Sequence, residues 1–411
     1  MRPLSRRNFL AAASAVAAAP LLPARLFAAT PDNTPVHGLS AFGELKYPVD
    51  FKHFDYINPD APKGGRMNFA PPNWAFNQSV LTFNTLNTFV FKGQAPVRAE
   101  MCFDTLMLRA LDEPDAIYGL LAESVSISAD RNTFTFKLRP EARWHDGAPL
   151  TAEDVAFTYK IFRDKDRAHP ALWDALKDVV EAVAVDDHTV RIVFDGKQGE
   201  QAVLSAATMP IVSKAYYEAN DFGASTMKPP LGSGPYRMGR ISAGSSIEYE
   251  RVADYWAQDL PVNRGQNNFD LIRIEFFADR DVAFEAFKKG DIHFRQEFTS
   301  RTWATAYHFP AIKEGRVIKR EFPRELAPQM QAIGLNQRRP QFQDVRVRRA
   351  IAMCFDFEWM KKNLFFNSYD RSQSSFEQSD FKATGLPSPE ELALLEPFRA
   401  ELPPEAFGEA V

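Results

Sequence analysis

The chain has 411 residues, a formal net charge of −4 and 45% hydrophobic residues, 35 phenylalanines among them. This length and apolar content predict two or three domains with large cores, and the acidic balance argues against a general binder of nucleic acid or anionic lipid. Two cysteines are too few for a disulfide framework. Cys102 and Cys354 both lie in apolar helical sequence, so we expect two buried thiols rather than a bridge.

Residues 1–29 are typical of an export signal. The run SRRNFL at residues 5–10 is a twin-arginine motif, a mildly apolar segment follows it, and small residues near Ala28 offer a site for a signal peptidase. Prolines and Arg25 interrupt the apolar run before it reaches the ~20 residues that a membrane-spanning helix needs. We therefore expect export to the periplasm and removal of this segment.

The first part of the mature chain is rich in loops. Gly64-Gly65 predicts a turn that enters a first core strand at residues 66–69. The segment from Asn77 to Gly93 contains too much Asn, Thr and Phe for an ordinary core helix. It fits either a structural loop, with its Asn residues in turns, or a polar and aromatic surface for a ligand.

A strand, a turn and a helix start follow one another between residues 120 and 160. Apolar and polar residues alternate from Thr133 to Arg139, which predicts a strand with one buried face. Asp146-Gly147 then favours a sharp reversal, and Thr151 with Asp154 in the first turn predicts a capped helix. His145 lies beside Asp146, but an Asp in a turn needs no chemical role, so we expect no catalysis here.

Two further units of secondary structure are predicted. Alternation on both sides of Asp186-Asp187-His188 indicates a β-hairpin over residues 183–194. A strand at residues 272–276, a helix beginning at Asp281 and ending at Gly290, and apolar residues at 292–294 indicate a right-handed parallel βαβ unit. No pair among the seven histidines has metal-ligand spacing with a carboxylate or thiol partner, so we expect no metal site and no cofactor.

The last part of the chain offers surface aromatics and a strand end. Arg301, Trp303 and Tyr307 lie close together in sequence, and a Trp face can hold a ligand side chain or pack against Arg, with a core Trp as the alternative. Asn336 follows the apolar run 332–335, which predicts a residue at the carboxyl end of a strand, where ligands of α/β sheets gather. Asp344 is expected to cap a helix.

Several blocks resemble family 5 of the extracellular solute-binding proteins, the peptide- and nickel-binding receptors of ABC importers. The resemblance rests on LAES, LRPEARWHDG and PLTAEDVAFTY between residues 121 and 159, on GSGPYRMGRISAGSSIEYERVADYW (232–256) and on IGLNQRRPQFQDVRVRRAIAMCFDFEWM (333–360). LNTFVFKGQAP (86–96), DEPDAIYGL (112–120) and TWATAYHFPAIKEGRV (302–317) are most similar to the subgroup for oligopeptides, microcin C-type conjugates and murein peptides. The blocks keep their order over residues 37–411.

The resemblance implies an α/β fold, a two-lobed periplasmic binding protein of type II with an extra small α+β subdomain. It implies lobe I segments at 30–96 and 215–300, the small subdomain at 97–214 and lobe II at 301–411. The expected function is capture of peptides or peptide conjugates and delivery to an inner-membrane permease with its ATPase. The protein is expected to act as a monomer, without nucleic acid and without catalytic residues.

The resemblance also favours a ligand role for part of the Asn77–Gly93 segment. In family receptors the corresponding segment lies beside the ligand cleft, so Asn87 would hydrogen-bond a peptide backbone and Phe89 would cover an apolar side chain. Arg301, Trp303 and Asn336 complete the expected substrate-binding set. A structural loop remains the alternative for the first two residues.

The second lobe is expected to be incomplete. Residues 388–391 form a good helix start, yet the sequence stops at Val411, whereas receptors of this subgroup continue and supply the acidic residue that holds the ligand's amino group. We therefore expect a truncated chain with weak independent stability for residues 301–411. The alternatives are a non-functional remnant, an exported peptide-binding sensor or chaperone, and an exported enzyme, against which no metal cluster, phosphate loop, nucleophile elbow or haem motif is found.

Overall fold

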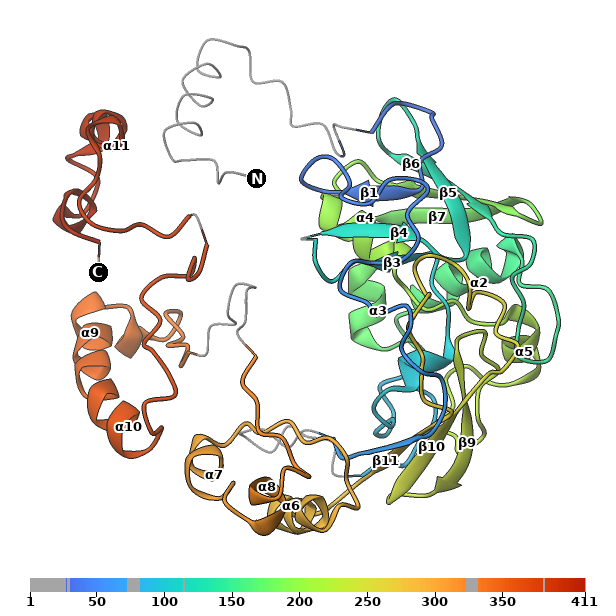
Figure 1. Cartoon of the computed structure of the whole chain (residues 1–411). Coiled ribbons are helices and arrows are strands. Elements are labelled where there is room, and N and C mark those ends of the chain that lie inside the picture. The colour runs from blue at the N-terminus through green and yellow to red at the C-terminus, as the bar shows by residue number, and fades with distance from the viewer. Residues whose placement is uncertain are drawn as a thin grey trace. The chain divides into compact units, whose positions relative to one another are not determined.

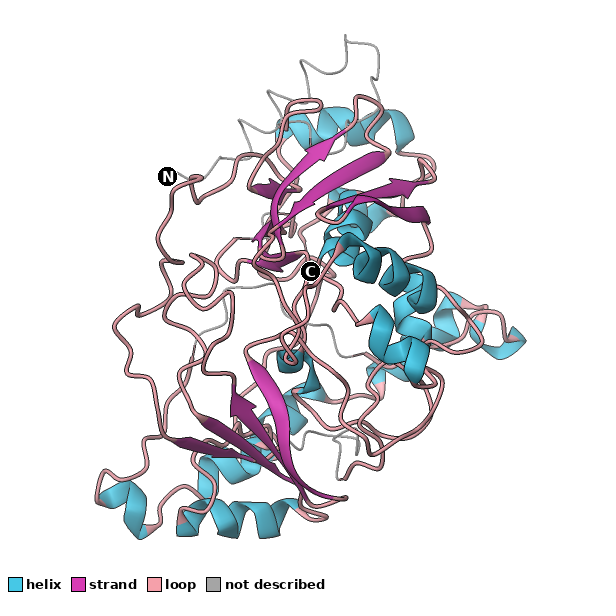
Figure 2. Cartoon of the chain, turned by 90° about the vertical axis from the view of Figure 1, so that its right-hand side faces the viewer, coloured by secondary structure: helices cyan, strands magenta, loops and turns pink. Residues whose placement is uncertain are grey.

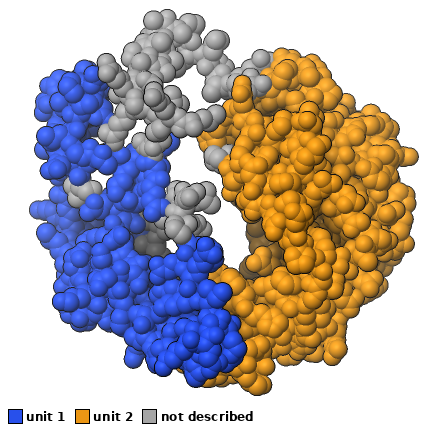
Figure 3. Space-filling model, viewed as in Figure 1, with its two compact units in different colours: residues 1–21, 297–411 blue, residues 22–296 orange. Residues whose placement is uncertain are grey.

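A computed structural model describes residues 27, 30–71, 82–113, 115–322, 332–379 and 381–410. The chain forms two compact units, drawn in different colours in Figure 3. One unit comprises residues 22–296, and residues 297–411 belong to the other. The boundary between the two units falls between Gln296 and Glu297.

A four-stranded antiparallel sheet contains the strand and the hairpin that were predicted from residues 133–139 and 183–194. Its order is β5-β6-β8-β7, with β5 (Ala122–Ile127), β6 (Thr133–Leu138), β7 (Val179–Asp186) and β8 (Thr189–Phe194). Phe134 and Phe136 of β6 are buried and lie opposite Ile192 and Val190 of β8. Helix α2 (Ala152–Phe162) packs against β7 and β8. The predicted strand, hairpin and helix start are confirmed.

A second four-stranded sheet joins two distant parts of the chain. Its order is β2-β11-β10-β9, with β2 (Arg66–Phe69), β9 (Tyr236–Ser242), β10 (Ser246–Arg251) and β11 (Leu271–Glu275). β2 runs parallel to β11, while β9, β10 and β11 are antiparallel neighbours. Figure 2 shows the two four-stranded sheets as separate groups of strands.

The predicted βαβ unit passes around one strand. After β11 comes α6 (Arg280–Lys289), and Phe294 then forms a parallel bridge with Phe69 of β2, so β2 lies between the two ends of the unit. The helix begins at Arg280, one residue before the expected Asp281, and it is capped by Asp279, whose carboxylate accepts from two backbone N–H groups. Gly290 ends it in the left-handed conformation, as predicted.

Shorter elements complete the unit of residues 22–296. They are the three-stranded sheet β1-β4-β3, with β1 (Gly38–Ser40), β3 (Met107–Arg109) and β4 (Ala116–Gly119), the 3₁₀ helix η1 (Ala99–Cys102), and α3 (Pro170–Ala175), α4 (Glu200–Ala207) and α5 (Lys214–Ala219). Figure 1 shows β1, β3 and β4 close to the β5-β6-β8-β7 sheet. Because β1 pairs with β4, residues 38–40 share a sheet with residues 107–119.

Phe27 lies in the core of the same unit. Its ring meets that of Phe134 edge to face with centroids 6.0 Å apart, and its carbonyl accepts from the Thr30 N–H over 2.8 Å. The Arg131 guanidinium donates to the Thr30 carbonyl and to the Asp32 carboxylate, both over 2.7 Å. A signal-peptidase cut near Ala28 would therefore take a core side chain away.

The unit that contains residues 297–411 is built from short helices. They are α7 (Ser300–Thr305), α8 (Pro310–Lys313), α9 (Val345–Met353), α10 (Phe357–Asn363) and α11 (Pro389–Leu395), with 3₁₀ turns η2 (Pro340–Phe342), η3 (Glu396–Phe398) and η4 (Pro404–Phe407). Asp344 caps α9 and Ser388 caps α11, as predicted. Many of its large apolar side chains are exposed, Ile333, Met353 and Trp359 among them.

Two expectations for this unit are wrong. Residues 332–336 form no strand, because none of the described strands lies beside them to accept and donate ladder hydrogen bonds. Cys354 is exposed at the end of α9, whereas Cys102 is buried as expected, and both thiols are free. The apolar sequence around Cys354 marked a helix face, but this face is not covered within the described chain.

Within the described ranges, no helix combines the length and apolar character needed to cross a membrane. The same residues contain no group of three or more His, Cys, Asp or Glu side chains placed to hold a metal ion.

Candidate functional site

Asn87 is a buried residue that fastens two loops together. Its side chain is 4% exposed, and its Nδ2 donates to the carbonyls of Phe222 (2.8 Å) and Ala224 (3.0 Å). Its Oδ1 accepts from the Phe89 N–H over 3.1 Å. These bonds satisfy most of what an amide can donate and accept, which is why Asn87 is tolerated in the interior.

Phe89 belongs to an aromatic cluster in the core. It is 3% exposed, and its ring centroid lies 5.0 Å from that of Phe103 and 5.1 Å from that of Phe162. Phe222 stacks on it at 6.3 Å. Both side chains are therefore buried in contacts within the unit, which favours the structural alternative over the expected ligand role.

Phe91, on the same segment, is the aromatic that sequence reasoning missed. Its side chain is 74% exposed, and its ring meets the His169 ring at a centroid distance of 5.2 Å. A hydrogen bond fixes the backbone of this segment, because the His169 N–H donates to the Phe89 carbonyl over 2.7 Å. An exposed aromatic on a fixed backbone suits contact with an apolar ligand group. Three successive apolar residues, Phe89 to Phe91, gave no alternation from which the exposed one could be recognised.

Trp303 on α7 forms a cluster with a cation. The Lys319 Nζ lies 4.1 Å from the centre of the Trp303 ring and donates to the Trp303 carbonyl over 2.7 Å. The indole N–H donates to Glu321 Oε1 over 2.9 Å, and the Tyr307 ring is 5.5 Å away. The sequence expected either a ligand side chain or an Arg on this Trp face, and the structure places Lys319 there.

Arg301 and Asn336 are both exposed. Arg301 lies on α7 with Trp303, and its carbonyl accepts from the Thr305 hydroxyl over 2.8 Å. Asn336 is in a turn, where its Oδ1 accepts from the Arg338 N–H over 3.1 Å. Among the predicted residues of this unit, α7 therefore brings Arg301 and Trp303 together, and Asn336 belongs to a different segment.

His145 takes part in the turn that the sequence predicted. Its Nε2 bonds to the Gly234 carbonyl over 2.8 Å, so this nitrogen carries the proton, and Gly147 has the positive φ of 88° that the turn needs. Burial lowers the pKa of His145. This contact joins the turn to the loop before β9.

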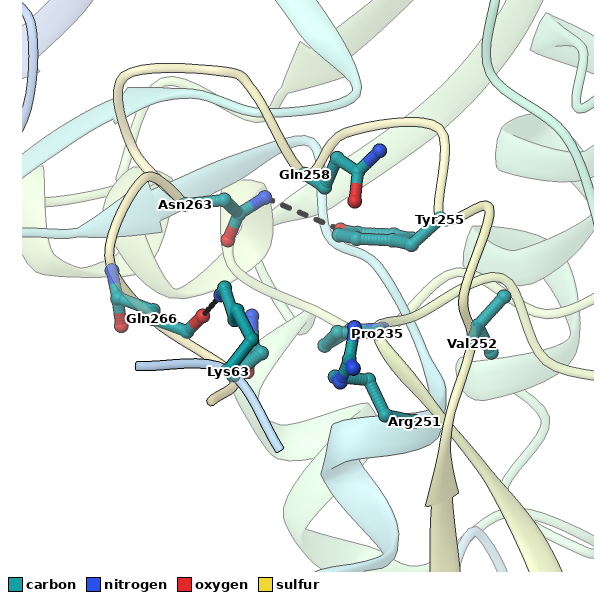
Figure 4. Close-up of a pocket in the computed structure, with 9 residues that line it drawn as sticks. Lys63, Pro235, Arg251, Val252, Tyr255, Gln258, Asn263 and Gln266 are labelled. Carbon is teal, nitrogen blue, oxygen red and sulfur yellow. Dashed lines mark hydrogen bonds between the residues drawn. The ribbon is translucent and has the colours of Figure 1, made fainter. Parts of the chain in front are cut away.

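A polar pocket lies on the unit of residues 22–296 (Figure 4). It has a volume of ≈ 270 Å³ including its open mouth, and it is lined by Lys63, Pro235, Arg251, Val252, Tyr255, Gln258, Asn263, Gln266 and Asn267. Asn263 Nδ2 donates to the Tyr255 hydroxyl over 3.3 Å, and the Lys63 ammonium donates to the Gln266 carbonyl. Loop 252–267 and the turn before β2 thus form it together, a proximity that local sequence patterns do not reveal.

Comparison with known families identifies two regions of the chain. The family described as "Bacterial extracellular solute-binding proteins, family 5 Middle" matches residues 116–405, which are well over half of the sequence. The twin-arginine translocation signal sequence matches residues 3–23. The protein is therefore exported by the twin-arginine route and is periplasmic.

Curated relatives extend this similarity over the whole chain. A "Probable peptide-binding protein YejA" of Agrobacterium fabrum is 39% identical over 99% of this chain and 65% of the relative. The "Uncharacterized protein YejA" of Escherichia coli is 39% identical over 90% of this chain and 59% of the relative. The chain thus spans less than two thirds of the length of either protein.

Solved structures confirm the fold class. DppA of Helicobacter pylori, an ABC transporter-associated periplasmic binding protein in complex with the peptide STSA, superposes with a TM-score of 0.58 at 19% identity, over 83% of this chain and 67% of that one. The oligopeptide-binding protein AppA of Bacillus subtilis, in complex with a nonapeptide, gives 0.56 at 20% identity, over 79% and 61%. The fold is that of the α/β periplasmic binding proteins, and the chain belongs to family 5 of the bacterial extracellular solute-binding proteins.

Proposed function

We propose that this chain is the substrate-binding component of an ABC importer that captures oligopeptides or peptide conjugates in the periplasm. The observation that carries the proposal is the family 5 match over residues 116–405, together with a relative named for peptide binding at 39% identity. A second relative, 37% identical over 91% of this chain, is named a peptidoglycan-binding protein, which fits a peptide with an attached group. The partner is an inner-membrane permease with its ATPase, and the receptor works as a monomer.

The work of such a receptor is binding and conformational change. A peptide offers backbone N–H and C=O groups in every sequence, so hydrogen bonds to them give affinity, while apolar contacts with its side chains add to it. Differential affinity for an open and a closed state then drives closure, and no bond of the ligand is altered.

Phe91 is the residue of the unit 22–296 that we assign to ligand contact. It is exposed, aromatic and fixed by the backbone bond between His169 and Phe89. In the other unit, Trp303 with Lys319 on its ring is the corresponding candidate, because a peptide group can pack beside an indole whose other contacts are already satisfied. Arg301 and Asn336, both exposed, are further candidates for polar contacts.

A retention experiment tests the proposal. The purified protein is incubated with a mixture of short peptides, freed of unbound peptide by gel filtration, denatured, and analysed by mass spectrometry. We expect a subset of the peptides to remain bound to the wild type in a near-stoichiometric amount. The Phe91→Ala variant should retain a smaller amount of the same peptides. Retention no greater than with an unrelated periplasmic protein would contradict the proposal.

A further inference from the structure

Two cations lie next to each other in the polar pocket of Figure 4, which the proposed function does not use. The Lys63 ammonium donates to the Gln266 carbonyl at one side of the pocket, and the Arg251 guanidinium lies beside it. Burial and the positive charge of Arg251 lower the pKa of Lys63, and the negative charge of Asp259 opposes them. An anion placed between the two side chains would relieve this repulsion.

Arg251 has a buried donor that makes no hydrogen bond to the described residues. Its Nη2 is paired with the Asp270 carboxylate, which also accepts from the Gly65 N–H over 3.1 Å. The Nε of Arg251 is buried, and no described residue supplies it with a hydrogen-bond partner. A buried N–H of a guanidinium is costly to leave unpaired, so a bound oxyanion toward which the Arg251 side chain turns its Nε would stabilise the site.

Some of the other polar groups of the pocket are already hydrogen-bonded within the described chain, and the Gln258 amide is not. Asn263 Nδ2 is bonded to Tyr255 and to the Ala257 carbonyl, and Gln266 Nε2 donates to the Val262 carbonyl over 2.7 Å. The Tyr255 proton is committed to Asp104. Gln258 is exposed, and its amide makes no hydrogen bond to any residue that the structure describes. Figure 4 shows Gln258 and Tyr255 on the side of the pocket opposite Lys63 and Arg251.

The size of the pocket limits what it can take. Its ≈ 270 Å³ includes the open mouth. Most of this volume is open mouth, so the enclosed part has room for a few atoms only: one carboxylate or phosphate group that reaches in from the mouth, and no whole peptide. Guanidinium and ammonium groups are the usual partners of carboxylates and phosphates.

We propose that this pocket binds a small oxyanion, a carboxylate or a phosphate group, between Lys63 and Arg251, with the Gln258 amide as an additional donor. The site lies wholly within the unit of residues 22–296. It does not depend on peptide binding, and its test is independent of the retention experiment.

Magnetic resonance of two probes tests the site on the full chain. The ¹⁹F line of fluoroacetate and the ³¹P line of inorganic phosphate are recorded at constant ionic strength with the wild type and three variants. Lys63→Met removes the ammonium and keeps the apolar stem, and Gln258→Glu places a negative charge at the exposed edge of the pocket. Lys52→Met is the matched control, because Lys52 is an exposed lysine of the same unit outside the pocket.

We expect at least one probe line to broaden with the wild type and with Lys52→Met, and binding about tenfold weaker with Lys63→Met and with Gln258→Glu. Broadening of the fluoroacetate line alone identifies a carboxylate site, and broadening of the phosphate line alone a phosphate site. Thermal unfolding of each variant establishes whether it is folded. If Lys63→Met does not fold, the comparison of Gln258→Glu with the wild type tests the proposal. Equal broadening with all four proteins, or none with the wild type, overturns the proposal.

Discussion

The Tyr255 hydroxyl donates a hydrogen bond of 2.6 Å to the buried carboxylate of Asp104, which is 1% exposed. The Trp256 indole donates to the other oxygen of the same carboxylate over 2.9 Å, and the Asp104 N–H donates to Ser233 Oγ over 3.0 Å. Asp104 follows η1, whereas its partners belong to the loops on either side of β9 and β10. Through its carboxylate and its backbone N–H, Asp104 therefore joins three distant segments of the unit. Tyr255 also lines the polar pocket.

Asp104→Ala should destabilise the protein by about 2–4 kcal/mol, because it leaves the Tyr255 hydroxyl and the Trp256 N–H buried without their acceptor. Urea unfolding followed by circular dichroism measures the change. Asp254→Ala is the matched control, because Asp254 is an exposed aspartate in the loop of Tyr255 and Trp256, and the expected change is within about 0.5 kcal/mol. Equal effects of the two substitutions would show that the Asp104 bonds do not stabilise the fold.

The stability should depend on pH through the same residue. Burial raises the pKa of Asp104 to about 7, and the bonds from Tyr255, Trp256 and Ser233 oppose this rise. The folded state therefore binds a proton at a pH where the unfolded state has released it. The stabilising contribution is fully present below the unfolded pKa of about 3.9 and is lost as the pH rises through the folded pKa.

Between about pH 8 and pH 5, the wild type should thus gain stability relative to Asp104→Asn as the pH falls, by at most about 1.4 kcal/mol per pH unit. Urea unfolding of both proteins at several pH values measures the difference, and Asp104→Asn serves as the control because it cannot titrate. A difference that stays constant with pH would show that Asp104 remains ionised in the folded protein.

Asp154 should contribute more to the stability of the fold than its neighbour Glu153. The Asp154 carboxylate accepts from the Thr151 N–H over 3.0 Å, from the Lys214 N–H over 2.9 Å and from the Trp144 indole over 3.4 Å. Asp154→Ala should destabilise the fold by about 2–3 kcal/mol, since it removes the cap and leaves these donors unpaired.

Glu153→Ala is the comparison, because Glu153 lies in the same turn and makes only an exposed ion pair with Lys214 at 3.0 Å. Such pairs contribute about 0–1 kcal/mol. The midpoint of thermal unfolding ranks the two variants. Similar shifts for both would mean that the buried bonds of Asp154 are not stronger than a surface ion pair.

Substitution of Phe89 should lower the stability of the fold, and substitution of Phe91 should weaken peptide binding instead. Phe89→Ala opens a cavity among Phe103, Phe162 and Phe222 and should cost about 3–5 kcal/mol. Phe91→Ala removes an exposed ring, so it should change stability by less than about 1 kcal/mol while weakening peptide retention. Urea unfolding and the retention experiment measure the two properties. Unchanged retention with Phe91→Ala would remove Phe91 from the ligand site.

The elements that the sequence predicted correctly have local causes. The strand at residues 133–138 follows from alternation, the reversal at Gly147 from its positive φ, and the helix starts after Thr151, Asp344 and Ser388 from side chains that accept from the first turn. Each of these signals lies within a few residues of the structure it specifies.

The errors concern contacts between distant segments. The apolar run 332–335 has the composition of a strand, but a strand needs a neighbour, and none of the described strands is placed there. Cys354 has an apolar context that is not covered within the described chain. The burial of Asn87 depends on the carbonyls of Phe222 and Ala224, more than a hundred residues away, so its sequence context suited both a ligand role and a structural one.

The central claim is that this family 5 receptor carries a peptide ligand, and a native mass spectrum of the protein taken from the periplasm of its own cells tests it most directly. The account predicts a folded protein that carries a small ligand, released on activation in the gas phase, with the fragmentation pattern of a peptide or a peptide conjugate. A protein without ligand that also fails to take up any peptide from a mixture would contradict it.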